Sequence, residues 1–152
     1  TRIGAIVGCG LEGMQLGRLN GFKGALASAG ITVDDALVRN VSDTVAGGHE
    51  ATDSLLEQHP DLTAIFCTND LMAYGASQAL ADRNIRIPQD ISLIGITDIQ
   101  LARDMRPALT TVALGIEQVA TMSINLLLDL IENPQHEPTI MHVPDPVLVV
   151  RA

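Results

Sequence analysis

The feature of this sequence that most constrains its fold is a regular alternation of short apolar runs with longer helical segments. Each apolar run is rich in Ile, Val, Ala or Leu, and polar or Gly residues separate it from the helical segment that follows. This order, βαβαβαβ, predicts an α/β fold with a parallel sheet flanked by helices. Strands are expected at 3–7, 36–39, 64–67 and 91–96, and helices at 14–29, 45–58 and 70–82.

The alternation breaks after Asp98. Residues 99–109 look irregular, because Pro107 blocks a helix there. The last helical segment is apolar around much of its circumference, which predicts burial on most sides or association with another copy. The expected elements of this part are a lone strand at 110–112, a helix at 116–131, a polar loop at 133–138 and extended segments at 139–143 and 147–151.

The composition argues against several classes of protein. The 152 residues carry a formal net charge of −9, and so acidic a surface repels the phosphates of nucleic acids. Aromatic residues are only 2%, which argues against base-stacking platforms. No apolar run approaches the ~20 residues of a membrane span. The two cysteines form no disulfide framework, which favours a reducing cytoplasm, and the missing initial Met suggests a fragment of a longer protein.

One local motif suggests an enzyme. Residues 8–13, GCGLEG, match G-x-G-x-x-G between a strand and a helix, and Asp34 stands roughly where a dinucleotide-binding loop would need a ribose-binding carboxylate. A tight turn and a solvated loop aspartate explain the same residues, so both readings stay open on the motif alone. No G-x-S-x-G motif is present and the four histidines lack ligand spacing, so we expect neither a nucleophilic enzyme nor a metal site.

Several linked motifs are more specific than the glycine pattern. The segments "NDLMAYGA", "IPQDIS", "GITD" and "PALTTV" occur in order within residues 69–112, after "GRLNGFKGALASAGI" and before the closing "PDPVLVVRA". In these segments the chain closely resembles the effector-binding domain of the lactose-repressor/galactose-repressor (LacI/GalR) family of bacterial transcription regulators. The resemblance covers nearly the whole chain, and it makes the glycine motif a loop at the ligand site rather than a pyrophosphate cradle.

The resemblance implies a type I periplasmic-binding-protein-like domain, in which two α/β lobes close on a small molecule. Residues 1–98 would form the core of the second lobe, 99–135 a crossover strand and helix of the first lobe, and 136–152 the return to the second lobe. The expected function is binding of a sugar-like effector and homodimerisation in a cytoplasmic regulator, which needs no cofactor. Operator DNA would be bound only by a headpiece missing from this chain. A periplasmic sugar-binding protein of the same fold is the alternative.

Effector contacts carry over by position to Arg18, Asn69, Thr97 and Asp43. An arginine offers a fork of donors for hydroxyl or phosphate oxygens, and an asparagine both donates and accepts. Thr97 departs from the family, where many members have an aspartate that accepts two ligand hydroxyls. Residues 40–48 lack the usual sugar-stacking aromatic, and Asp43 or Thr44 falls near its position, which weakens the case for an ordinary hexose. The resemblance also implies a dimer surface at Leu71, Met72, Tyr74 and Ala76.

Overall fold

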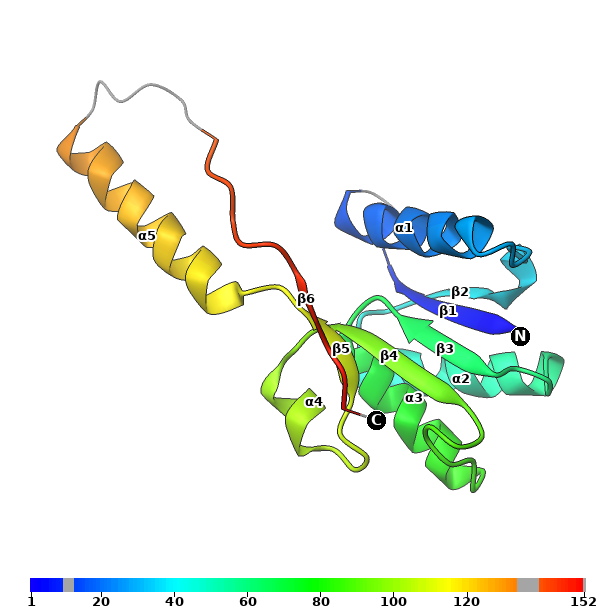
Figure 1. The fold of residues 1–152 in the computed structure, drawn as a ribbon. Coiled ribbons are helices and arrows are strands. Elements are labelled where there is room, and N and C mark those ends of the chain that lie inside the picture. Colours follow the sequence, from blue (N-terminus) through cyan, green and yellow to red (C-terminus); the bar gives the residue numbers. More distant parts are fainter. Residues whose placement is uncertain (10–12, 134–139, 152) are drawn as a thin grey trace.

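A six-stranded sheet forms the centre of the molecule. The computed structural model describes residues 1–9, 13–133 and 140–151 (Figure 1). The strands are β1 (Ile3–Gly8), β2 (Val38–Val41), β3 (Ala64–Cys67), β4 (Ser92–Thr97), β5 (Thr110–Ala113) and β6 (Val147–Val149). Their order across the sheet is β2-β1-β3-β4-β5-β6, and only β6 runs antiparallel to its neighbour. The predicted parallel α/β sheet is therefore confirmed.

Helices cover both faces of this sheet (Figure 1). The helices are α1 (Met14–Ser28), α2 (Val45–Gln58), α3 (Asp70–Asp82), α4 (Gln100–Asp104) and α5 (Ile116–Glu132), with a 3-10 turn η1 (Asp35–Leu37) before β2. The larger core lies under α2 and α3, where Ile6, Leu55, Ile65 and Met72 are fully buried. Strand alternation turns Ala5 and Val7 to the opposite face, where they pack under α1 in a smaller core.

Helices α2 and α3 pack unusually close together. A Cβ atom on Gly48 would overlap the backbone carbonyl oxygen of Met72, and a Cβ on Gly75 would overlap that of Val45. The two glycines therefore allow backbone-to-backbone contact between the helices. This contact fixes the position of the amino end of α3, which begins at the polar edge of the sheet described below.

Helix α5 leaves the body of the molecule instead of covering the sheet (Figure 1). None of its residues is buried, and its large apolar side chains are exposed by about half, with Ile124 at 56% and Ile131 at 66%. The sequence predicts that this apolar helix is buried. Its apolar side chains would therefore have to be covered by atoms outside the described residues. No described helix is both long and apolar enough to cross a membrane.

Two local predictions need correction. The segment expected to be irregular contains the short helix α4, which ends before Pro107 and carries too few residues to show helical spacing. The second strand begins two residues late, because Asp34 accepts a hydrogen bond from the Ala36 amide and starts η1. The segment expected to be extended at 139–143 pairs with no strand over residues 140–143, and residues 134–139 lie outside the described part.

The expected boundary after Asp98 is also wrong. Strand β5, predicted to belong to the first lobe, pairs in parallel with β4, with Gly95 opposite Thr111. A strand hydrogen-bonded along its length to β4 is part of the same sheet, so the unit that begins at residue 1 includes β5. Strand β6 completes that sheet beyond β5.

Candidate functional site

Polar side chains gather at the carboxyl ends of the parallel strands. Asp43 follows β2, Asn69 follows β3, Thr97 ends β4, and Arg18 lies in the second turn of α1, which follows β1. In open parallel sheets, loops at this edge form the ligand-binding site. The topology therefore brings together four segments that are far apart in the sequence.

Asp43 is the centre of this group. Its Oδ1 atom accepts hydrogen bonds from the side-chain amides of Asn69, at 2.6 Å, and Gln15, at 3.1 Å. The carboxylate lies against the backbone of Gly8, because a Cβ atom built there would overlap it. The first glycine of the G-x-G-x-x-G motif thus makes room for a carboxylate from another loop.

Arg18 lies beside this carboxylate and is partly buried. Its Nη1 donates to the Thr68 carbonyl oxygen at 2.6 Å, and its Nη2 lies 3.2 Å from the sulfur of Met14. Burial lowers the pKa of the guanidinium, and the nearby carboxylates of Asp43 and Asp70 oppose this shift. The group stays charged at neutral pH, since the pKa of an arginine starts so far above 7.

Asn69 has two roles. Its Oδ1 accepts from the Met72 amide at 2.9 Å and caps α3, while its Nδ2 donates to Asp43. The cap holds the side chain in one orientation, with the amide nitrogen facing the site. Arg18, Asp43 and Asn69, all predicted as effector contacts, are therefore in one cluster.

Thr97 lies at the same edge but is not hydrogen-bonded to that cluster. It lines a separate hollow of about 670 Å³ between α4 and the start of α5, together with Gln100, Arg103 and Glu117. Thr97 and Asp98 have φ angles of 134° and 58°, a region that side chains other than glycine rarely adopt. Two such residues in succession must be held by their surroundings.

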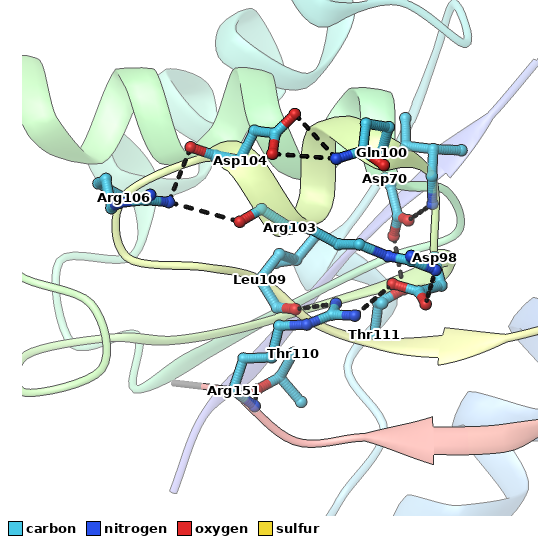
Figure 2. A network of polar contacts seen from close by, with 11 residues as sticks. Asp70, Asp98, Gln100, Arg103, Asp104, Arg106, Leu109, Thr110, Thr111 and Arg151 are labelled. Carbon is cyan, nitrogen blue, oxygen red and sulfur yellow. Dashed lines mark hydrogen bonds and ion pairs between the residues drawn. The ribbon is translucent and has the colours of Figure 1, made fainter.

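A partly buried polar network holds this turn (Figure 2). Asp70 accepts from the Ile99 amide at 3.0 Å and from the Thr111 hydroxyl at 2.6 Å, and is 1% exposed. Asp98 pairs with Arg103 at 2.9 Å and Arg151 at 2.6 Å.

The protonation of Asp98 depends on these two arginines. Burial acts to raise the pKa of Asp98, but the hydrogen bonds from Arg103 and Arg151 outweigh it and keep the pKa below its ordinary value. Asp98 is therefore charged at neutral pH, and its ion pairs join the end of β4 to α4 and to the chain after β6. Sequence reasoning missed this network, because residues that pair within it, such as Asp98 and Arg151, are 53 positions apart.

The residues proposed for dinucleotide binding do not form such a site. Gly8 ends β1 and Gly13 precedes α1, while residues 10–12 lie outside the described part. Asp34 lies before β2, at its amino end, where it caps η1 and is 3.5 Å from Arg2. It cannot serve a ligand at the carboxyl edge. Among the described residues no cluster of His, Cys, Asp or Glu could hold a metal ion.

The predicted dimer surface divides in two. Leu71 is 41% exposed and Tyr74 is half-buried, so both reach the surface of α3. Met72 and Ala76 are fully buried in the core, because the α3 face that carries them packs against α2 and the sheet. For these two residues the prediction is wrong: their contacts are within the chain.

Known proteins are similar to this chain in fold and in sequence. A family model described as a periplasmic binding protein-like domain matches residues 1–152. The chain is 42% identical over 134 residues to the HTH-type transcriptional regulator GalR of Escherichia coli, covering 88% of this chain and 39% of that protein. It is 35% identical over 150 residues to the ribose operon repressor of Haemophilus influenzae, covering 99% and 45%. The chain thus spans less than half the length of these curated relatives.

Solved structures agree with the sequence relatives. A complex of the transcriptional regulator CelR with cellobiose has a TM-score of 0.87 at 31% identity, covering 99% of this chain and 46% of that chain. A LacI-family regulator from Enterococcus faecium with bound ribose also has a TM-score of 0.87, at 30% identity, covering 98% and 55%. The fold class and family predicted from the motifs are confirmed. The chain belongs to the periplasmic binding protein-like domain family, and the relatives it resembles are transcriptional regulators, one of them described as a member of the LacI family.

Proposed function

We propose that this chain is the sugar-effector-binding and dimer-forming part of a LacI-type regulator of transcription. The single observation that carries the proposal is the cluster of Arg18, Asp43 and Asn69 at the carboxyl edge of the sheet. It combines a cation, an anion and an amide, the groups that orient polar ligands, on three segments that the sheet places at one edge. The relatives named above are regulators, which favours this role over that of a transporter binding protein.

The exposed helix α5 supports a two-lobed arrangement. An apolar helix that finds no partner in the described residues fits a segment that belongs to another lobe, as expected for residues 116–131. We therefore assign α5 to the first lobe, and the cluster to the second lobe's half of an effector site between the lobes. Effector binding would change lobe closure, because the ligand has different affinities for the open and closed forms.

The remaining parts of the proposal concern partners and compartment. Because this chain is acidic, operator DNA would be bound by a headpiece outside residues 1–152. The whole regulator would act in the cytoplasm and would not catalyse a reaction. A homodimer would use the exposed surface of α3 at Leu71 and Tyr74, which is the part of the expected interface that remains accessible.

A titration followed by NMR tests the effector site. Amide shifts of the 152-residue chain are recorded with a panel of mono- and disaccharides that includes ribose and cellobiose. We expect shifts at the Arg18, Asp43 and Asn69 positions. Arg18→Ala and Asn69→Ser should weaken binding about ten-fold or more, the value of a charge-assisted hydrogen bond. Serine retains a cap for α3 but is too short to reach the site as asparagine does.

The control is Arg86→Ala. Arg86 is an exposed arginine that pairs with Asp90 before β4, at the other edge of the sheet, so its loss should leave sugar binding unchanged. Amide shifts confined to other regions would reject the cluster as the effector site. So would a sugar affinity of both site variants equal to that of the wild-type chain, with the fold intact.

A further inference from the structure

We propose that the sheet face beside α1, where it crosses β3 to β6, is the docking surface for a helix from outside residues 1–152 that leads directly into β1. This inference goes beyond the proposed function and does not depend on the effector site. It depends on an apolar groove, on the shape of α1 and on the path by which the chain enters β1.

The groove has a volume of about 390 Å³ and is lined mainly by apolar residues. Phe66 and Ile94 line it from β3 and β4, and Phe22 and Ala25 line it from α1. The rings of Phe22 and Phe66 are stacked, with centroids 5.2 Å apart. Among the described helices only α1 packs on this face, because α2, α3 and α4 pack on the other (Figure 1). Parallel sheets have both faces covered, so an open apolar stretch indicates a missing cover.

The open face continues from the groove across β5 and β6. Ile94 is opposite Thr110, and Val112, two residues further along β5, is opposite Leu148. Paired residues and residues two apart lie on the same face of a sheet, so these side chains and that of Val150 all lie on the groove side. Leu148 is 56% exposed and Val150 is 73% exposed. An apolar surface that extends over four strands marks an interaction site.

The side of α1 that borders the groove is shaped for another helix. Ala25 lines the groove, and Gly21, four residues earlier, lies on the same side of α1. A Cβ atom on Gly21 would meet nothing within 4 Å, so no described contact requires a glycine there. Glycine weakens a helix, but it lets a second helix approach closely, as Gly48 and Gly75 do between α2 and α3.

The path of the chain identifies the occupant. Ile3, the first residue of β1, lines the groove, so the chain that enters β1 arrives beside it. In the strand order, α1 leads from β1 outward to β2, whereas α2 and α3 lead in the opposite direction and lie on the other face. By this right-handed rule, a helix that lies over β3 and β4 and leads into β1 belongs on the face of α1.

Other helices fit the groove less well. The exposed helix α5 leaves the body at the carboxyl edge, and the groove is open in the position that α5 has (Figure 1). The α3 surface proposed for the homodimer lies on the other face of the sheet, so a dimer built there leaves the groove free. The curated relatives are more than twice as long as the part that this chain matches, so a longer regulator can supply the helix.

Photocrosslinking in the whole regulator tests which segment fills the groove. The photoreactive residue p-benzoylphenylalanine is placed at Ser92, an exposed position that lines the groove, and at Glu50 on the exposed side of α2 as a control. After irradiation we expect the Ser92 position to be joined, within one chain, to the peptide directly before Thr1, as identified by mass spectrometry. The Glu50 position should not be joined to that peptide.

Thiol labelling measures whether the groove face is covered. In a Cys9→Ser background, Leu148→Cys should react with a maleimide at least about ten-fold more slowly in the whole regulator than in the 152-residue chain, because labelling then requires local opening. In the whole regulator Gly21→Leu should restore much of the labelling, since its side chain blocks close approach. Asn20→Leu is the control, because Asn20 is exposed and lies on a different side of α1 from Ala25.

Each outcome decides the inference. Crosslinks from Ser92 to residues 116–132, a crosslinked dimer, or no crosslink at all would overturn it. Equal labelling of Leu148→Cys in the two proteins, or equal effects of Gly21→Leu and Asn20→Leu, would overturn it as well. The sugar titration tests the effector site separately, so either proposal can fail without the other.

Discussion

Replacing Gly48 by alanine should destabilise the chain strongly, although alanine is the better helix former. The new Cβ would overlap the backbone of α3 at Met72, and backbone atoms cannot move aside as the end of a side chain can. The helices must separate locally by about 1 Å, which costs a quarter to a half of the dispersion energy of the contacts involved. Overpacking of this kind costs about 1–3 kcal/mol, and we expect the upper end because α2 and α3 enclose the larger core.

The matched control is Gly24→Ala in α1. A Cβ atom there meets nothing within 4 Å, so only the helix preference of alanine acts, and it should stabilise by about 0.5–1 kcal/mol. Urea unfolding followed by circular dichroism measures both variants. With a slope near 2 kcal/mol per molar, Gly48→Ala should lower the midpoint by about 1 M or more and Gly24→Ala should raise it slightly. Shifts of the same sign in both variants would refute the close contact between α2 and α3.

Three further outcomes are expected. In the folded chain the pKa of Asp98 lies below its ordinary value, so its contribution to the free energy of unfolding is complete above about pH 4 and is lost as the pH falls below that value. As the pH is lowered below about 4, the urea midpoint of Asp98→Asn should therefore fall less than that of the wild type. Gly8→Ala should expel the Asp43 carboxylate and shift the Asp43 amide resonance, while the sheet persists by circular dichroism. Leu71→Glu should reduce self-association in sedimentation without lowering the urea midpoint, whereas a larger effect of Ile131→Glu on association would place the contact on α5 instead of α3.

Most of the fold could be predicted from the sequence, because its strands and helices are set by local patterns. The helix α2 has its predicted bounds, since Thr44 caps its first turn and Pro60 follows its end. The largest error falls where a tertiary contact overrides the pattern. The assignment of β5 to another lobe was wrong because a four-residue strand does not show which neighbour it pairs with, and that neighbour is β4.

The site was only partly predictable for a similar reason. Family motifs gave Arg18 and Asn69, whose residue types match the family pattern. They did not give Gln15, because no motif covers its position, and its role appears only once Asp43 is placed beside it. The buried positions Met72 and Ala76 show the opposite failure. The same motif marks a helix that has an inner and an outer face, and the motif does not say which residue lies on which.

The neighbouring residues Asn69 and Asp70 show how one turn serves two parts of the molecule. Asn69 is directed at Asp43 in the polar cluster, while Asp70 is directed into the protein and holds the Ile99 amide and the Thr111 hydroxyl. The Asp70 carboxylate is thus bonded to the segments that lead to and from α4, next to the positive-φ turn at residues 97 and 98. Because the two side chains leave the same helix start, a displacement of α3 at the cluster must also move the contacts that hold that turn. The hollow lined by Thr97 and the cluster around Asp43 are separate in space but share this one support.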